Sequence, residues 1–297
     1  MGWHSVWRSA VVALLVMATG WLLPAQPPEA RETRYVPAGR ITIGYESLSH
    51  PAVQTYVEQF RSASGLRGLA SSLNQSLPFY RHIMDTLRSY GLPEQLFFVA
   101  LIESGFDPFA VSRSGAVGIW QFMDHSVEDW MIITSDIDER RDFYRATLGA
   151  AEKLLHNFTI FEDWLLAIAS YNAGVGHIQR AMEASGALTF WELLETDLLP
   201  DQTRSYVPRF VAVSHVASQA ARHGLSLPWS ESPEWVRLAV PARTSLSQLS
   251  QRSGVPAQQI MDWNPHIIAD IRTHGLDSVL YINIPDLYEH YFTWLSD

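Results

Sequence analysis

The chain contains no cysteine. Disulfide bridges, thiolate nucleophiles and zinc sites built on cysteine are therefore excluded. Histidine occurs 11 times, but no two histidines have the spacing that an H-E-x-x-H zinc site requires. A G-x-S-x-G nucleophile elbow and a phosphate-binding glycine loop are also lacking. We therefore expect neither a metal nor an organic cofactor.

Positive charge is scarce, because 21 Lys and Arg stand against 31 Asp and Glu and the formal net charge is -10. No cluster of Lys and Arg offsets this balance, so most of the surface would repel a phosphate backbone and nucleic-acid binding is not expected. Hydrophobic residues make up 47% of the chain and charged residues 18%, which is typical of a globular protein. The 11 Trp and 11 Tyr include candidates for flat surfaces on which sugar rings stack. The oligomeric state does not follow from these values.

Long apolar runs are lacking except near the N-terminus. Arg8 precedes an uncharged apolar run from Ala10 to Leu23, and a polar stretch begins at Pro24. The run is shorter than the roughly twenty residues of a membrane-spanning helix, and its layout is that of an export signal. We interpret residues 1–28 as a signal peptide or a retained N-terminal anchor, with cleavage favoured, and expect a protein of the periplasm or cell envelope. A lipid anchor on cysteine is excluded.

The next two parts of the chain differ in pattern. Residues 29–49 form a polar linker with one short strand-like piece, Arg40–Tyr45. Residues 50–225 carry apolar side chains at three- and four-residue spacings, with Gly and Pro between the segments, which predicts one helical domain. The predicted helices are Val53–Ala63, Phe79–Tyr90, Glu94–Ser104, Arg145–Phe158, Asp163–Tyr171, Gly176–Ala184 and Tyr206–His223.

A different pattern occupies residues 234–288. Glu234–Ala242 and Ser278–Pro285 alternate in the manner of strands. Between them lie two short helical segments, Leu246–Ser253 and Ala257–Asp262. This order predicts a small β-α-α-β domain, which without disulfides or metal is expected to depend on the first domain for stability. The predicted fold class is therefore mainly α, with a small mixed domain at the C-terminal end.

Glu103 closes the predicted helix Glu94–Ser104. Pro93 suits the start of that helix and Gly105 the residue after its end, so Glu103 lies in the last turn. The unpaired carbonyls of a helix C-terminus and apolar neighbours both disfavour a negative charge, and both raise the pKa of a carboxyl group. A carboxyl group that stays protonated near neutral pH is a candidate general acid. The alternative is a surface glutamate that happens to end a helix.

The stretch Glu103–Met123, "ESGFDPFAVSRSGAVGIWQFM", combines small residues with polar groups between aromatic rings. Its small residues Gly115, Ala116 and Gly118 let another chain segment or a ligand approach the backbone closely. Trp120 and Phe122 offer apolar faces, and Gln121 offers both a donor and an acceptor. Ser112 is a candidate hydrogen-bond partner of the carboxyl group at the start of the stretch. This combination suits a carbohydrate site better than a phosphate site.

Three other charged residues receive a structural interpretation. Asp107 is followed by Pro108 and is interpreted as a turn or capping residue rather than a second catalytic carboxylate. Arg140 and Arg141 are expected to pair with the acidic residues of their own segment, Asp136–Asp142, rather than with a substrate carboxylate.

The same stretch carries a family resemblance. Glu103–Met123 matches the pattern "ES.F.P.A.S..GA.G.WQFM", which resembles the signature of the lytic transglycosylases with a goose-type-lysozyme-like fold, the SLT family. "SYNAGVG", Ser170–Gly176, and "QTRSYVP", Gln202–Pro208, resemble two later blocks of this family in the same order. Asp136–Thr147 and the C-terminal unit look closest to the branch of membrane-bound lytic murein transglycosylase D. Three positions depart from the family pattern: Ser170, Asp124 and Gln202 stand where Ala, Pro and Glu are usual.

The resemblance implies a mainly α, lysozyme-like catalytic domain in residues 50–225 that acts on peptidoglycan strands. Glu103 is then the sole catalytic residue. As an acid it protonates the glycosidic oxygen between N-acetylmuramic acid (MurNAc) and N-acetylglucosamine (GlcNAc). As a base it takes the proton of the muramyl 6-hydroxyl, which closes on C1 to give a 1,6-anhydro end without consuming water. The implied substrate-binding residues are Ser112, Gly118, Gln121, Met123, Tyr171, Asn172 and Tyr206.

Residues 234–288 resemble a degenerate LysM module. The helical part and the closing strand, "LYINIP", match the module, whereas its opening Gly-Asp-Thr is absent. Such modules bind glycans that contain GlcNAc; a merely structural appendage is the alternative. For the whole chain three interpretations stay open: a lytic transglycosylase, a hydrolytic muramidase of the same fold, and a catalytically weak cell-wall-binding protein. The intact set of Glu103, Ser112 and Gln121 favours an enzyme.

Overall fold

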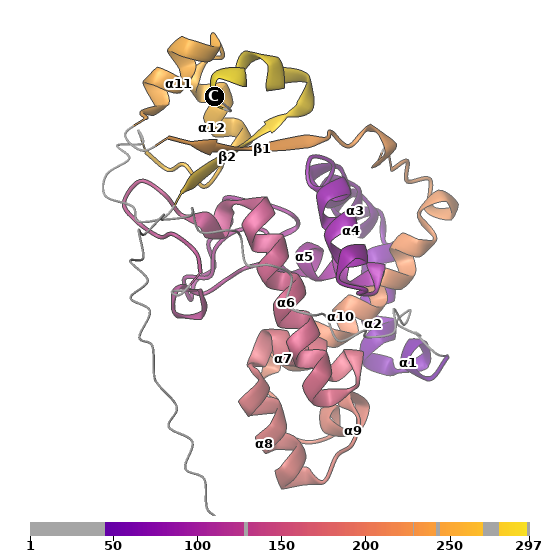
Figure 1. Cartoon of the computed structure of the whole chain (residues 1–297). Helices are drawn as coiled ribbons and strands as arrows, with labels where there is room; N and C mark the ends of the chain where they lie inside the picture. Colours follow the sequence, from indigo (N-terminus) through magenta and orange to yellow (C-terminus); the bar gives the residue numbers. More distant parts are fainter. Residues whose placement is uncertain (1–44, 128–129, 228, 242–243, 270–278, 296–297) are drawn as a thin grey trace, which may run out of the picture. The chain divides into compact units, whose positions relative to one another are not determined.

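The computed structural model describes residues 45–127, 130–227, 229–241, 244–269 and 279–295 (Figure 1). All of them belong to one unit, Tyr35–Asp297. The predicted signal peptide or anchor, and the predicted strand-like piece except Tyr45, lie outside the described residues. Within the described part of the chain, no helix is both long enough and apolar enough to cross a membrane.

The described residues up to 227 are mainly helical, as the sequence predicts. Their α-helices are α1 (Tyr45–Ser49), α2 (Pro51–Arg61), α3 (Ala63–Gln75), α4 (Tyr80–Ser89), α5 (Phe97–Ser104), α6 (Phe143–Phe161), α7 (Trp164–Ala173), α8 (Val175–Ser185), α9 (Phe190–Leu194) and α10 (Asp201–Ser218). The 3-10 turns are η1 (Glu94–Leu96), η2 (Asp124–Ser126), η3 (Glu139–Arg141) and η4 (Ala220–His223), and η5 (Trp229–Glu231) follows. Each predicted helix is present, with one or both ends shifted.

Helix α3 is an element that the sequence does not predict. Its segment, "ASGLRGLASSLNQ", is rich in Ser and Gly, which weaken intrinsic helix propensity. The helix forms because Leu69 and Leu73, four residues apart, are buried in the core. The Ser62 hydroxyl also caps its N-terminus by accepting from Gly65 N at 3.0 Å. Burial of these two leucine side chains in the core thus outweighs the low helix propensity of the segment.

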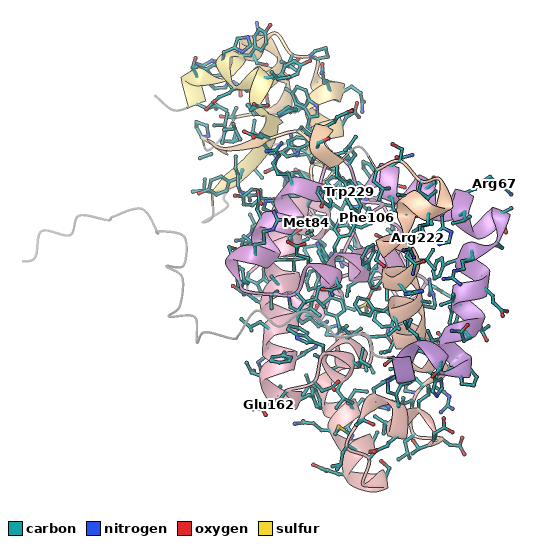
Figure 2. The ribbon with its side chains drawn as sticks, turned by 90° about the vertical axis from the view of Figure 1, so that its right-hand side faces the viewer. Arg67, Met84, Phe106, Glu162, Arg222 and Trp229 are labelled. Carbon is teal, nitrogen blue, oxygen red and sulfur yellow. The ribbon has the colours of Figure 1, made fainter. Side chains whose placement is uncertain are left out.

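The core of the helical part surrounds α10, which contacts α2, α5 and α7. Val207 and Phe210 on α10 are 0% exposed. At the start of α5, the Phe97 ring lies 4.6 Å from the Phe106 ring and meets Trp229 edge-on at 5.6 Å (Figure 2). Because interiors are close-packed, these rings fix the start of α5 against the loop after it and against η5, and α5 also packs directly on α10.

Residues 235–295 contain the predicted β-α-α-β order. The elements are β1 (Trp235–Val240), α11 (Leu246–Ser253), α12 (Ala257–Trp263) and β2 (Leu280–Pro285), followed by the turns η6 (Asp286–Tyr291) and η7 (Thr293–Leu295). The two strands pair antiparallel, with Leu238 opposite Ile282. Leu249, Ile260 and Ile282, all 0% exposed, are central to a second hydrophobic cluster. The prediction of a mainly α fold with a small C-terminal sheet is confirmed.

A buried carboxylate joins the two strands to α6. Asp142 is 0% exposed and caps the helix by accepting from Tyr144 N at 3.0 Å. It also accepts from Arg237 on β1 at 2.9 Å and from Asn283 on β2 at 2.8 Å. The Arg237 guanidinium lies 4.8 Å from the ring centres of both Tyr144 and Tyr281. This cluster fixes the sheet against the N-terminus of α6.

Candidate functional site

Glu103 lies in the last turn of α5, as predicted. The helix ends there because Gly105 takes a left-handed conformation (φ 65°), and its N–H donates to Leu101 O. The start differs from the prediction: Pro93 precedes the 3-10 turn η1, and α5 begins only at Phe97. Glu103 therefore closes a helix of 8 residues.

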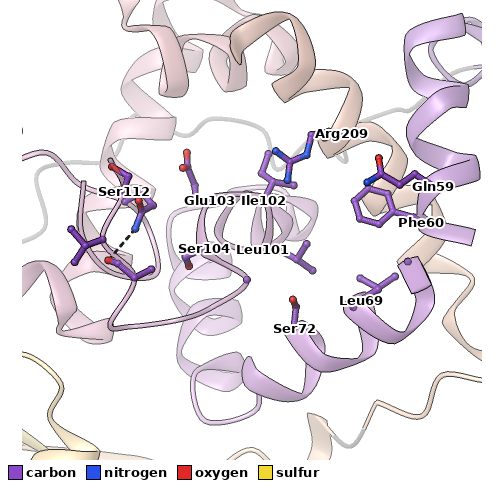
Figure 3. Close-up of a pocket in the computed structure, with 16 residues that line it drawn as sticks. Gln59, Phe60, Leu69, Ser72, Leu101, Ile102, Glu103, Ser104, Ser112 and Arg209 are labelled. Carbon is purple, nitrogen blue, oxygen red and sulfur yellow. Dashed lines mark hydrogen bonds between the residues drawn. The ribbon is translucent and has the colours of Figure 1, made fainter. Parts of the chain in front are cut away.

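A cavity of about 580 Å³ lies beside this carboxyl group (Figure 3). The loop after α5 supplies one wall, and α2 and α3 supply another. Three of the predicted site residues, Glu103, Ser112 and Gln121, line it together. Among the described lining residues, Glu103 is the only carboxylate.

Tyr206 holds the carboxyl group of Glu103. Its hydroxyl, on α10, donates to Glu103 Oε1 at 2.5 Å. Burial raises the pKa of Glu103 to about 7, and the Tyr206 hydrogen bond and the charges of Lys153 and Arg209 oppose this rise. The shift has the predicted direction, with burial as its largest cause. Near pH 7 both the acid and the carboxylate forms of Glu103 are therefore populated, so the group can give and take a proton.

Lys153 belongs to this site although no motif includes it. It lies on α6, with its Nζ 4.3 Å from the centre of the Tyr171 ring. Its charge lowers the pKa of Glu103, while burial lowers the pKa of Lys153 itself. The sequence indicates an unusual position for this lysine. Lys153 lies between Ala150 and Asn157 on the buried face of α6, where the helical spacing predicts a buried side chain.

Arg209 is a second cation that no motif includes. It lines the cavity from α10 and follows Tyr206 by three residues. Residues three apart lie on one side of a helix. The spacing from Tyr206 is thus the signal by which the sequence points to Arg209.

Ser112 does not bond the Glu103 carboxyl group, contrary to the expectation from the sequence. Its Oγ accepts from Ala116 N at 2.9 Å and lies 3.1 Å from Ser114 Oγ. These contacts fix the turn that follows Ser112. Among the described residues, Tyr206 is the hydrogen-bond partner of the carboxyl group.

Gln121 and Gly118 shape the other end of the same loop. Gln121 has a left-handed backbone (φ 53°), and its Nε2 donates to the carbonyls of Gly118 at 2.8 Å and Ala110 at 3.3 Å. Gly118 has φ 82° and lies so close to the Arg140 carbonyl that a Cβ would clash with it. Gly118 therefore lets two backbone segments meet, and it does not line the cavity.

The remaining predicted site residues do not line the cavity. Tyr171 is buried, and its hydroxyl donates to Trp120 O at 2.9 Å. Asn172 Oδ1 accepts from Thr203 Oγ1 at 2.9 Å. Met123 is partly exposed and directly precedes η2.

The charges interpreted as structural have structural partners. Asp107 Oδ1 accepts from Phe109 N at 2.8 Å and so forms a turn. Arg140 donates two hydrogen bonds to Asp138, at 2.9 and 2.8 Å. Arg141 Nε also lies 4.0 Å from Asp138 Oδ2. The turn at Asp107 and the pairing of both arginines within their own segment are therefore confirmed. Within the described ranges, no group of three His, Cys, Asp or Glu residues is arranged to hold a metal ion.

Replacing Tyr206 by Phe is expected to raise the pKa of Glu103 above about 7. The hydroxyl stabilises the carboxylate by donating to it, so its loss favours the protonated form. The ¹³C resonance of the Glu103 side-chain carboxyl group, followed through a pH titration, measures the shift. Tyr171→Phe is the matched control, because that buried hydroxyl bonds Trp120 O instead. An unchanged pKa, or an equal rise in the control, would contradict this account.

Comparison with known proteins places the site in a family. Residues 82–194 match the transglycosylase SLT domain. Over 215 residues the chain is 27% identical to membrane-bound lytic murein transglycosylase D of Escherichia coli (strain K12), covering 70% of this chain and 46% of that protein. Over 115 residues it is 34% identical to membrane-bound lytic murein transglycosylase F of Desulfosudis oleivorans, covering 36% of this chain and 24% of that protein.

The chain spans less than half of the length of either curated relative. A solved structure of an inactive mutant of lytic transglycosylase Slt from Pseudomonas aeruginosa aligns with a TM-score of 0.40 and 23% identity, over 48% of this chain and 24% of that one. The SLT match includes Glu103, Ser112 and Gln121, whereas Tyr206 and Arg209 follow it. The resemblance read from the motifs is confirmed: residues 82–194 form a transglycosylase SLT domain, and the chain is related to the membrane-bound lytic murein transglycosylases.

Proposed function

We propose that this chain is an exported lytic transglycosylase that cleaves the β-1,4 bond between MurNAc and GlcNAc in peptidoglycan without hydrolysis. One observation carries the proposal: Glu103, a single carboxyl group with a pKa raised to about 7, lines a cavity of about 580 Å³. Murein is named in the descriptions of both curated relatives, which supports this choice of polymer.

One carboxyl group serves both steps of the proposed reaction. Glycosidases ordinarily use two, whereas Glu103 is the only carboxylate among the described lining residues. In the first step the Glu103 acid gives its proton to the glycosidic oxygen, the bond from C1 to that oxygen breaks, and GlcNAc leaves as an alcohol. In the second step the 6-hydroxyl of the same MurNAc attacks C1 and returns its proton to the Glu103 carboxylate. The 1,6-anhydro ring is then closed and the acid is restored.

The surroundings of Glu103 support both roles. Burial favours the protonated form that the first step needs. The hydroxyl of Tyr206 and the charge of Lys153 stabilise the carboxylate that exists between the two steps. Because the 6-hydroxyl is tethered to the reacting sugar, ring closure also benefits from a high effective concentration.

The strand is proposed to bind along the loop after α5 and the neighbouring helices. Ser112 and Gln121 line the cavity beside the acid, and their polar groups suit the hydroxyl and acetamido groups of a sugar. Gly118 contributes indirectly, by letting this loop pass the backbone of Arg140. Of the substrate-binding residues implied by the motifs, Ser112 and Gln121 line the cavity, whereas the others are proposed to shape the groove around it: Gly118, Met123, Tyr171, Asn172 and Tyr206.

The other parts of the proposal concern partners and location. The partner is the peptidoglycan strand, and the proposed reaction uses no cofactor. Residues 234–288 are proposed to act as a LysM-like module that binds glycans containing GlcNAc, beside the catalytic domain at 50–225. Export to the periplasm or cell envelope is proposed on the segment at 1–28, and both curated relatives are described as membrane-bound.

Digestion of purified sacculi by the protein is expected to release muropeptides with 1,6-anhydro-MurNAc ends. These ends lack one water relative to reducing ends, so mass spectrometry of the products separates the two reactions. In ¹⁸O-labelled water the anhydro products carry no label, which provides an internal control. Reducing, labelled ends would identify a hydrolytic muramidase. Binding to sacculi without any release, by a folded protein, would identify a cell-wall-binding protein.

A further inference from the structure

The cavity extends from Glu103 toward α2 and α3, away from the loop that follows α5. In the view of Figure 3, Arg209 lies between Glu103 on one side and Gln59 and Phe60 on the other. The residues from α2, α3 and α10 lie outside the matched SLT segment 82–194. None of the substrate-binding residues proposed from the motifs lines this half of the cavity.

Arg209 is a partly buried cation that makes no hydrogen bond or ion pair with any residue in the described ranges. Glu103 is near enough for the charge of Arg209 to lower its pKa, yet the two form no ion pair. Two other arginines of low exposure have carboxylate partners: Arg140 lies 2.8 Å from Asp138, and Arg237 lies 2.9 Å from Asp142. Because a partly buried charge without a partner is unfavourable, Arg209 is suited to an anionic ligand.

Two neutral polar side chains share this half of the cavity. The amide of Gln59 on α2 and the hydroxyl of Ser72 on α3 line it, and neither has a hydrogen-bond partner in the described part of the chain. Phe60, Leu69 and Ile102 supply apolar walls. A guanidinium, an amide N–H and a hydroxyl are all donors, and together they match the acceptors of a carboxylate.

We propose that Arg209, with Gln59 and Ser72, forms a subsite that binds a carboxylate of the glycan strand beside the scissile bond. This inference rests on the proposed function, because it takes the peptidoglycan strand as the ligand. The strand offers carboxylates from two sources: the lactyl group of a MurNAc without a stem peptide, and the amino acids of a stem peptide. A guanidinium binds either group through two parallel hydrogen bonds.

The acid and the subsite support each other. Glu103 is partly protonated near pH 7, since its pKa is about 7, and a protonated acid does not repel a bound carboxylate. The bound carboxylate in turn offsets the charge of Arg209, which otherwise favours ionised Glu103. An occupied subsite therefore favours the protonated form of Glu103, the form that gives its proton in the first step.

The affinity of short glycan strands for the Glu103→Gln protein tests the subsite independently of cleavage. Three ligands are compared by calorimetry: strands with free lactyl carboxylates, the same strands after conversion of these groups to methylamides, and strands that carry stem peptides. Adding Arg209→Gln is expected to raise Kd for at least one carboxylate-bearing ligand by about tenfold or more. For the neutral methylamide strands Kd should change by less than about twofold.

Two further variants control for charge and fold. Arg67→Gln removes the same charge from an exposed position on α3 and should leave every Kd unchanged (Figure 2). Arg209→Lys keeps the charge but loses the paired hydrogen bonds, and should retain part of the affinity.

Each outcome decides the proposal. If Arg209→Gln lowers the affinity only for strands with free lactyl carboxylates, the lactyl group is the ligand. If it lowers the affinity only for strands that carry stem peptides, the ligand is a stem-peptide carboxylate. Equal losses on charged and neutral strands, or no loss on any strand, would overturn the subsite. If the wild-type protein makes anhydro products but Arg209→Gln leaves the Kd of every strand unchanged, only the subsite proposal is wrong. If Kd depends on Arg209 and no anhydro products form, only the proposed reaction fails.

Discussion

Replacing Glu103 by Gln is expected to lower the release of anhydro-muropeptides from sacculi by about 1,000-fold or more. An amide gives no proton to the glycosidic oxygen and takes none from the 6-hydroxyl, so both proposed steps are lost. The amide matches the carboxyl group in size, and Tyr206 can still donate to its oxygen as it does to Glu103 Oε1. Initial rates of product release, quantified by mass spectrometry, measure the effect.

The matched control for this variant is Glu183→Gln. Glu183 is exposed on α8 and makes no hydrogen bond or ion pair with the residues that the structure describes, so its variant should keep full activity. Glu103→Gln should also stay folded. The pKa of Glu103 is raised from 4.5 to about 7, so the stability of the wild type declines as the pH rises through this interval. The glutamine side chain stays neutral, so the variant does not lose this stability. If a folded Glu103→Gln protein kept near-wild-type activity, a residue other than Glu103 would be the general acid.

The position and chemistry of Glu103 are predictable from the sequence because their causes are local. Gly105 ends the helix within two residues of the carboxyl group, and the apolar side chains of the same helix indicate burial. The family resemblance adds Tyr206, which is distant in the chain and which no local pattern joins to Glu103. The structure supplies the contact itself, a hydroxyl 2.5 Å from the carboxylate oxygen.

The features that sequence patterns miss depend on competition or on tertiary packing. The sequence predicts Ser112 as a candidate partner of the acid, but the Ser112 hydroxyl accepts from the backbone N–H of Ala116, because nearby backbone groups compete effectively for a serine. Helix propensity does not predict α3, which forms one wall of the cavity, because the segment is rich in Ser and Gly. The helix is stabilised instead by the burial of Leu69 and Leu73. Arg209 has a weak signal of helical spacing, and its lack of a partner is visible only in three dimensions.

The two halves of the cavity differ in the charge of their polar side chains, and Glu103 lies between them. The loop after α5 contributes the neutral groups of Ser112 and Gln121, and the opposite half contributes the charge of Arg209. Uncharged sugar hydroxyl and acetamido groups fit the first half, and a strand carboxylate fits the second. If the proposed strand crosses both halves, the two sets of contacts are separable by mutation.

Replacing Asp142 by Asn is expected to lower the free energy of unfolding by about 3 kcal/mol or more. The variant leaves Arg237, whose side chain is only 15% exposed, without its negative partner. Asn is a good helix cap, so the loss of the α6 cap contributes little and the change reports on the charge. Thermal and denaturant unfolding followed by circular dichroism measure the difference.

The pH dependence of stability provides a second readout of the same cluster. Burial alone would raise the pKa of Asp142, but the charges of Arg237 and His266 and the hydrogen bonds from Asn283 and Arg237 together hold it below 3.8. The contribution of Asp142 is therefore complete above the unfolded pKa and is lost as the pH falls through the lower folded pKa. The difference in stability between wild type and Asp142→Asn should accordingly shrink at acidic pH.

Two comparisons separate this coupling from a general effect of charge. Asp85→Asn removes one member of an ion pair whose side chains are 63% and 55% exposed, and should change stability by less than about 1 kcal/mol because solvent screens the pair. Arg237→Gln should be strongly destabilising in the wild type but much less so in the Asp142→Asn protein, because its partner charge is already absent there. Equal losses in both backgrounds would show that Asp142 and Arg237 act independently, and that their ion pair does not hold the sheet to α6.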